Sequence, residues 1–131
     1  VLNVASTAAF QPLPGQAGYA ASKAFVLSYT HGLRGELKGT GVTATALCPG
    51  PVKTEFVEVA GFESGDAEGS VPSFMWVDAD DVARAAVGAM AAGKAVVIPG
   101  AGNKVTALAG HFTPRALLVP LVARQHPSLK S

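Results

Sequence analysis

The sequence contains a single cysteine, Cys48, among its 131 residues. One thiol excludes a disulfide within the chain and any zinc site built from several cysteines. Because disulfides belong to oxidising compartments, the lack of a second cysteine favours a reducing one, and we expect a cytoplasmic protein. The three histidines, His31, His111 and His126, are scattered without metal-ligand spacing, so we expect no metal site.

Charge of either sign is also scarce. Ten Lys and Arg against nine Asp and Glu give a net charge of +1, and charged residues make up only 15% of the chain. This near balance provides no electrostatic footprint for a nucleic acid partner. Hydrophobic residues make up 49%, which excludes the disordered class and suggests that part of the surface is covered by something else.

The chain has no long hydrophobic run. The longest apolar run, residues 116–123, contains Pro120 and is flanked by Arg115 and Arg124, and it is far short of the ~20 residues that cross a bilayer. Such a tail could lie on a membrane surface or pack against another subunit, and both alternatives stay open. Residues 1–10 lack the basic start of a signal peptide.

The remaining segments alternate as in a parallel α/β fold. β-Favouring runs at residues 1–6, 42–47 and 95–98 predict three strands. An Ala- and Leu-rich stretch from about Gln16 to Lys38 and a second from about Asp78 to Gly93 predict the helices between them. This order is typical of a doubly wound, Rossmann-like parallel sheet with right-handed crossovers.

Two segments depart from this alternation. Residues 51–77 follow the second predicted strand, where a long irregular loop is often functional, and we expect a substrate loop there. Residues 103–131 predict an apolar C-terminal extension, helical but broken near Thr113-Pro114 and again at Pro120. The large apolar side chains of the loop form either a lid over the substrate or the buried underside of the loop. They are Phe56, Phe62, Phe74, Met75 and Trp76.

A tyrosine and a lysine lie near the start of the first predicted helix. Tyr19 and Lys23 are four residues apart and therefore share a helix face. A neighbouring ammonium group stabilises a phenolate, and a phenol in that setting can act as a general acid or base near neutral pH. The first predicted strand ends at Ser6, whose hydroxyl could bond the same reacting oxygen or cap nearby backbone. Together the three side chains could polarise a carbonyl or deprotonate an alcohol.

Several motifs in this order resemble the short-chain dehydrogenase/reductase family. The interval of 13 residues between Ser6 and Tyr19 is the family's usual one, and a Pro-Gly-x-x-x-Thr element follows the second predicted strand. The resemblance is close over residues 1–54, looser over 78–99 and faint elsewhere. The stretches that carry it are Asn3-Val4-Ala5-Ser6, Pro14-Gly15-Gln16-Ala17-Gly18-Tyr19-Ala20-Ala21-Ser22-Lys23-Ala24, Gly41-Val42-Thr43 and Cys48-Pro49-Gly50-Pro51-Val52-Lys53-Thr54.

The resemblance implies an oxidoreductase that transfers a hydride between NAD or NADP and a secondary alcohol or ketone, with NADP slightly favoured and an apolar substrate expected. Tyr19 would be the general acid or base, Lys23 would support it and bind the nicotinamide ribose, and Ser6 would hold the substrate oxygen. The resemblance also implies a homo-oligomer. The Ala-rich face of the first helix either packs against the sheet or lets helices of two subunits approach closely, as in the family, and we favour the second. By the same resemblance, the residues that would line the nicotinamide pocket are Pro49, Gly50, Val52 and Thr54.

Some features of the family have no counterpart in the sequence: its Gly-rich phosphate-binding turn, its upstream catalytic Asn, and the residue that selects NAD or NADP. We therefore expect residues 1–131 to be a single partial domain, the C-terminal catalytic half of a Rossmann-like domain within a longer natural chain. Two alternatives stay open, a catalytically silent binding or assembly module and an epimerase or dehydratase of the same family. The intact Ser6, Tyr19 and Lys23 favour the oxidoreductase.

Overall fold

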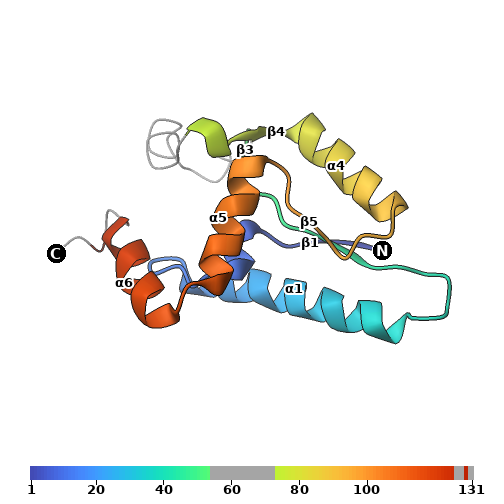
Figure 1. Ribbon diagram of the computed structural model, residues 1–131, viewed down its shortest axis with the longest axis horizontal. Helices are drawn as coiled ribbons and strands as arrows, with labels where there is room; N and C mark the ends of the chain where they lie inside the picture. The colour runs from blue at the N-terminus through green and yellow to red at the C-terminus, as the bar shows by residue number, and fades with distance from the viewer. Residues whose placement is uncertain (54–72, 126–128, 130–131) are drawn as a thin grey trace.

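A three-stranded parallel sheet forms the centre of the molecule (Figure 1). The computed structural model describes residues 1–53, 73–125 and 129. The strands lie in the order β1-β2-β5, so that β2 is paired on both sides. Each strand is shorter than the run that predicts it, because pairing is limited to the residues that face a partner strand. The bounds are β1 Leu2–Val4, β2 Thr45–Leu47 and β5 Val96–Val97.

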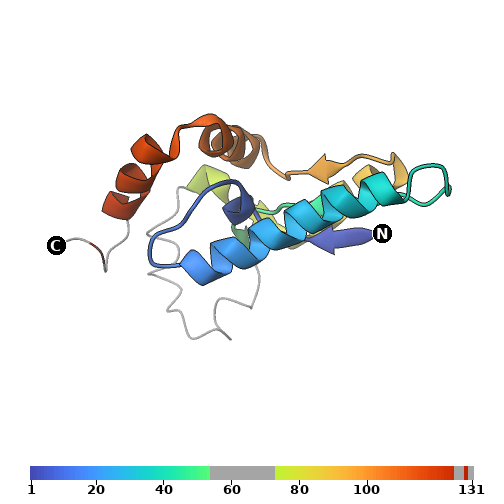
Figure 2. The ribbon, with the colours of Figure 1, turned by 90° about the horizontal axis from the view of Figure 1, so that it is seen from below.

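Helices cover both faces of this sheet (Figures 1 and 2). Helix α1 packs against β1 and β2, whereas α4 packs against β2 and β5 from the opposite side. The bounds of the helices are α1 Ala17–Glu36, α4 Ala79–Ala91, α5 Ala101–Phe112 and α6 Arg115–Gln125. Parallel strands with α1 and α4 on opposite faces confirm the predicted doubly wound α/β class.

The strand β2 and the residue after it contribute to both hydrophobic cores. Ala46 and Cys48 face the α1 side, whereas Leu47 faces the α4 side and packs with Val82 and Ala86. Successive side chains of a strand point to opposite faces, so a strand that is covered on both sides needs apolar residues throughout. The run of small apolar residues in the sequence meets that requirement.

A second, two-stranded sheet follows the turn after β2. Strand β3 (Val52–Lys53) pairs in parallel with β4 (Val77–Asp78). The predicted substrate loop of residues 51–77 therefore contains strand residues at both of its ends, which the sequence does not show because two-residue strands are too short for alternation. The rest of that loop, residues 54–72, lies outside the described residues.

The C-terminal end of α1 is tied to the sheet by Arg34. Its guanidinium donates hydrogen bonds to the carbonyl oxygens of Ala44 (3.2 Å) and Gly93 (2.7 Å). Beyond the helix, Gly39 adopts a φ of +86°, a conformation that glycine reaches at little cost. The glycine signal that predicts the end of this helix thus marks a real turn, although the helix itself ends at Glu36, two residues before the predicted Lys38.

The C-terminal extension forms helices α5 and α6. The predicted break at Thr113-Pro114 is confirmed, since α5 ends before it and α6 begins directly after it. The predicted break at Pro120 is wrong, because α6 continues through this residue. A proline inside a helix removes one main-chain hydrogen bond and crowds the preceding turn, and the buried side chain of Leu118 offsets this cost by packing the helix against the rest of the molecule.

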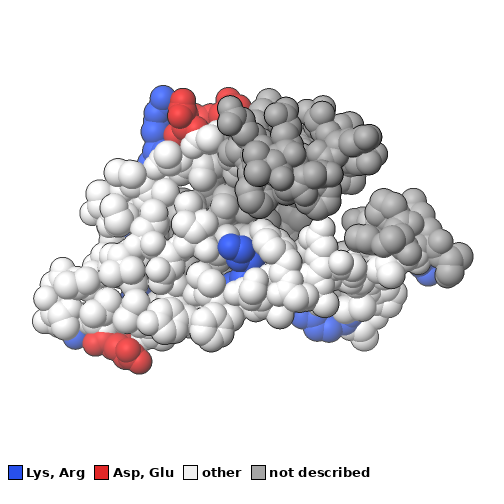
Figure 3. Space-filling model, turned by 180° about the vertical axis from the view of Figure 1, so that it is seen from behind, with Lys and Arg blue, Asp and Glu red and all other residues white. Residues whose placement is uncertain are grey.

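The surface carries little charge, as the composition indicates. Figure 3 shows a face on which most of the described surface is neither acidic nor basic, with acidic side chains at its upper and lower left edges. Within the described residues a single ion pair is present, between Arg84 and Asp81 of α4, at 3.4 Å. In the same part of the chain, no helix combines the length and the apolar character that crossing a membrane requires.

Candidate active site

The loops that leave β1 and β2 meet beyond the sheet. The Ala5 amide donates to the Leu47 carbonyl (2.7 Å), and the Thr7 amide donates to the Pro49 carbonyl (3.0 Å). Both loops lie at the carboxyl ends of parallel strands, where open α/β sheets bind their ligands. These bonds bring Ser6, from the first loop, next to the turn that begins at Pro49 in the second.

Ser6 caps the short 3-10 helix η1 (Thr7–Phe10). Its Oγ accepts a hydrogen bond from the Ala8 amide (3.1 Å), and the residue is buried. A hydroxyl oxygen that accepts one bond can still donate its own proton. The cap therefore fixes the position of Oγ and leaves its hydrogen for another acceptor. Within the described residues, the side chains of Ser6 and Tyr19 share no hydrogen bond.

A tight turn sets the start of α1 and thereby the place of its tyrosine. Gly15 adopts a φ of +87°, and the Gln16 amide donates to the Leu13 carbonyl at 2.9 Å. Glycine adopts this left-handed conformation without the steric cost of a side chain. The helix that follows has 20 residues without an internal proline, so that Tyr19 lies in its first turn and Lys23 in its second.

Tyr19 and Lys23 lie side by side on one face of α1. The Nζ atom of Lys23 is 5.7 Å from the centroid of the Tyr19 ring, within the range of a cation–π contact. Tyr19 is 49% exposed, which leaves its phenol accessible to a ligand. The structure therefore places an ammonium group beside an accessible phenol, as the spacing of the two residues predicts.

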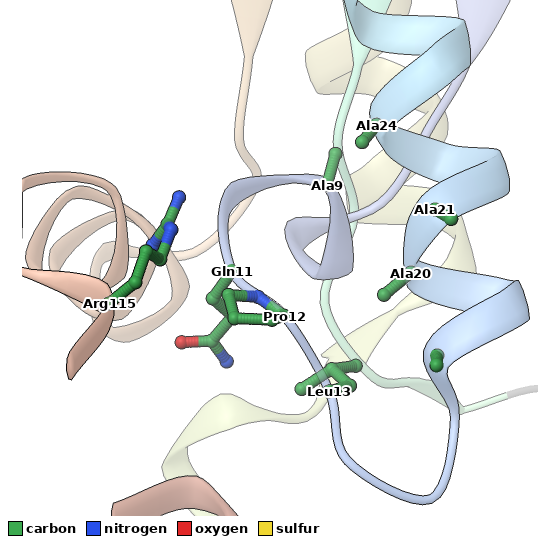
Figure 4. A pocket seen from close by; sticks show the side chains of 9 residues that line it. Ala9, Gln11, Pro12, Leu13, Ala20, Ala21, Ala24 and Arg115 are labelled. Carbon is green, nitrogen blue, oxygen red and sulfur yellow. The ribbon is translucent and has the colours of Figure 1, made fainter. Parts of the chain in front are cut away.

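A hollow of about 240 Å³ lies on a different face of α1 (Figure 4). At roughly 100° per helical residue, Ala17, Ala21 and Ala24 point about 100° or more away from Tyr19 and Lys23, whereas Ala20 lies at the border between the two faces. The Arg115 guanidinium in its wall already donates to the carbonyls of Gly110 (2.8 Å) and Phe10 (3.4 Å). The alanines that line this hollow belong in part to the face of α1 predicted to approach a second subunit. We place the candidate active site on the other face, which carries Tyr19 and Lys23. The lining residues are Ala9, Gln11, Pro12, Leu13, Ala17, Ala20, Ala21, Ala24 and Arg115.

The turn after β2 holds three of the four residues expected around a nicotinamide. Pro49 is fixed through its carbonyl, and Val52 begins β3. Gly50 lies against the side chain of Asn103, a fully buried residue that the sequence does not single out. The fourth expected residue, Thr54, lies outside the described residues.

The predicted lid is described in part. Phe56 and Phe62 lie outside the described residues. The ring of Phe74, in the 3-10 helix η2 (Ser73–Met75), lies against Gly102, where an added Cβ would be 2.6 Å from the ring. Phe74 is nevertheless 68% exposed, and Trp76 is partly buried. The two interpretations of these side chains, as a lid or as the underside of a loop, stay open.

Cys48 is buried and chemically protected. Burial raises the pKa of its thiol from the ordinary 9.0 to about 11, and a hydrogen bond from the Ser6 backbone acts in the opposite direction. Cys48 is completely buried in the core on the α1 side, as a structural residue would be.

We expect the Cys48 thiol to resist alkylation in the folded protein. A pKa higher by about two units lowers the thiolate fraction about 100-fold at pH 8, and burial blocks access further. Iodoacetamide labelling followed by mass spectrometry, with a sample in urea as the control, measures the difference. Equal labelling rates in the two samples would contradict the buried placement of Cys48.

The sequence over the site just described is similar to a known family. Residues 1–62, just under half of the chain, match the family model described as short chain dehydrogenase. The match supports a member of the short-chain dehydrogenase/reductase family. Sulfoacetaldehyde reductase 2 of Chromohalobacter salexigens is 48% identical over 59 residues, 45% of this chain and 23% of that protein. Serine 3-dehydrogenase of Rhizobium radiobacter is 38% identical over 86 residues, 63% of this chain and 34% of that protein.

Solved short-chain dehydrogenases share the fold of nearly the whole chain. One from Burkholderia cenocepacia, in complex with NADP, has 28% sequence identity and a TM-score of 0.70, covering 92% of this chain and 46% of that one. Another from Sphingobium yanoikuyae, in complex with NADPH, has 29% identity and a TM-score of 0.65, covering 91% and 44%. The predicted Rossmann-like fold is confirmed, and the chain spans about half the length of these dehydrogenases.

Proposed function

We propose that this chain is the catalytic part of an NAD(P)-dependent oxidoreductase that interconverts a ketone and a secondary alcohol. The observation that carries the proposal is the pair formed by Tyr19 and Lys23, with the ammonium 5.7 Å from an accessible phenol ring. The pair lies on the helix that follows β1, close to the carboxyl ends of β1 and β2. The match to the family model and the NADP and NADPH complexes of solved members of the family support a nicotinamide dinucleotide as the cofactor.

The residues present fit the nicotinamide end of such a cofactor. The Lys23 ammonium and the Tyr19 phenol are hydrogen-bond donors of the kind that ribose hydroxyls accept. The place that a side chain at Gly50 would take is filled by Asn103, which holds the backbone of this turn in position. We propose that Pro49, Gly50 and Val52 contact the nicotinamide, with Thr54 as a fourth contact. The cofactor, when bound, supplies or takes up the hydride.

We propose that Tyr19 moves the proton of this reaction. In the direction of reduction, its phenol gives a proton to the carbonyl oxygen of the substrate, and in oxidation the phenolate takes the proton of the alcohol. The Lys23 ammonium stabilises the phenolate that remains after the transfer. Ser6 donates a hydrogen bond to the same substrate oxygen, while the Ala8 amide holds Oγ in place at 3.1 Å.

We further propose that the apolar surface of the C-terminal extension is covered by a second subunit or by a membrane surface. Phe112, Leu117 and Leu121 are exposed, whereas Leu118 is buried. No Asp or Glu follows Asp81 in the sequence, and the basic residues after it are Arg84, Lys94, Lys104, Arg115, Arg124 and Lys130. A second subunit and a membrane surface both stay as proposals, and an oligomer seen by light scattering favours the former.

An assay of the intact gene product tests the proposed function. We expect oxidation of NADPH or NADH, followed by its absorbance, when ketones of graded apolar character are added. An apolar substrate would show as a KM that falls with chain length. Binding of the nucleotide without turnover of any carbonyl compound would favour the silent module, and conversion of a nucleotide sugar without net nicotinamide oxidation would favour the epimerase or dehydratase.

A further inference from the structure

The amide of Asn103 joins two distant segments of the chain. Asn103 lies in the first turn of α5 and has no exposed surface. Its Nδ2 donates to the carbonyl oxygens of Met75, before β4 (2.8 Å), and of Pro99, after β5 (3.3 Å). Because both partners are acceptors, the nitrogen of the amide must face them, which fixes its orientation.

The opposite side of this amide supports the turn after β2. An added Cβ at Gly50 would lie 2.5 Å from Cγ of Asn103 and 2.8 Å from Nδ2, so that only glycine fits between the turn and the amide. At Gly100, which has a φ of +88°, an added Cβ would lie 3.1 Å from the same Nδ2. The amide is therefore enclosed by the turns that follow β2 and β5 and by the residue that precedes β4.

Packing alone does not explain an amide at this place. Oδ1 of Asn103 is buried and has no hydrogen-bond partner within the described residues. A leucine, which has the same branching and the same number of side-chain heavy atoms, would occupy this place without burying an unpaired oxygen, which is unfavourable. What a leucine lacks are the two N–H groups that hold Met75 and Pro99.

We infer that Asn103 is a positioning residue that holds the Pro49-Gly50 turn in the place where it meets the nicotinamide. The inference rests on the proposed function. The turn continues directly into β3, which pairs with β4, and the Asn103 amide contacts the segments that precede both strands. Since the Pro49 carbonyl also accepts the Thr7 amide at 3.0 Å, a shift of the turn would displace the loop that carries Ser6 as well.

The test compares Asn103→Leu with Thr45→Val in the intact gene product. Thr45 is equally buried, and its Oγ1 donates to the Lys94 carbonyl at 2.7 Å, so this substitution also removes a buried hydrogen bond. Thr45 lies at the start of β2, whereas the turn follows the end of this strand. The readouts are the Kd for NADPH and NADH by fluorescence titration, the split between KM and kcat, and the Tm. We expect Asn103→Leu to raise the nucleotide Kd and KM at least tenfold with a smaller change in kcat, and Thr45→Val to keep the Kd within twofold.

Equal Kd values for the two variants, at similar losses of Tm, would overturn the inference and leave Asn103 a structural residue. If the unmodified protein binds neither nucleotide, the proposed function itself fails, which separates the two outcomes. Should Asn103→Leu not fold, Asn103→Asp takes its place, because a protonated carboxyl can donate one of the two lost bonds. Its Kd, relative to that of the unmodified protein, is then expected to recover as pH falls, and a ratio independent of pH would overturn the inference.

Discussion

Replacement of Tyr19 by Phe is expected to lower kcat for ketone reduction by about 10²–10⁴-fold, the usual contribution of a positioned general acid or base. The substitution removes one oxygen atom from a residue that is 49% exposed, so the fold and the Tm should not change. The Kd for the reduced nucleotide should rise only modestly, because the phenol supplies one hydrogen bond among several. Stopped assays of ketone reduction with the intact gene product measure kcat, and the nucleotide titration measures the Kd, so that the effect on catalysis is separated from the effect on binding.

Tyr29→Phe is the matched control for this experiment. Tyr29 lies on the same helix, is 57% exposed and stacks on Phe25 with 6.1 Å between the ring centroids. Loss of its hydroxyl leaves that stacking in place and should leave kcat unchanged. Full activity of Tyr19→Phe, or an equal loss in both variants, would remove Tyr19 from the proposed mechanism.

Replacement of Gly50 by Ala is expected to lower both stability and nucleotide affinity. The added Cβ would lie 2.5 Å from Cγ of Asn103, and neither group can move away because the amide is enclosed by the turns at Gly50 and Gly100. Overpacking of this kind costs about 1–3 kcal/mol, which corresponds to a fall in Tm of roughly 2–12 °C for a whole domain of about 150–250 residues. Thermal unfolding followed by circular dichroism measures it.

Gly88→Ala controls for the introduction of a methyl group as such. Gly88 is an exposed residue within α4, and an added Cβ there meets no atom within 4 Å. Alanine in the middle of an exposed helix is more favourable than glycine by about 0.5–1 kcal/mol, so the Tm should hold or rise. A Gly50→Ala protein as stable as Gly88→Ala would show that the turn is not packed against Asn103.

The sequence predicts those parts of the molecule that depend on local periodicity. The helix of Tyr19 and Lys23 is long and apolar on one side, and its stop is marked by glycine, so its bounds and the shared face of the two residues follow from spacing alone. The small residues of β2 likewise predict a strand covered on both faces.

The parts that the sequence does not predict depend on contacts between distant segments. The two-residue strands β3 and β4 exist only because the turn after β2 meets the residues before α4, and neither is long enough to leave a pattern. The sequence around Asn103 is recognisable only as an apolar segment. The hydrogen-bond partners of Asn103, the carbonyls of Met75 and Pro99, are 28 and 4 residues away. Pro120 breaks a helix by its local preference, yet the burial of Leu118 outweighs it.

The central position of β2 has a consequence for the motions of the site. Its amides are bonded on both sides, with Thr45 donating to Val1 at 2.8 Å on the β1 side and Ala46 donating to Ala95 at 2.9 Å on the β5 side. Amides in such a doubly flanked, solvent-free strand exchange their hydrogens only when the whole domain opens. The turn at Pro49 therefore follows a strand whose amide hydrogens are expected to exchange slowly. When a ligand binds, we expect the segments on either side of this strand to move, rather than the strand itself.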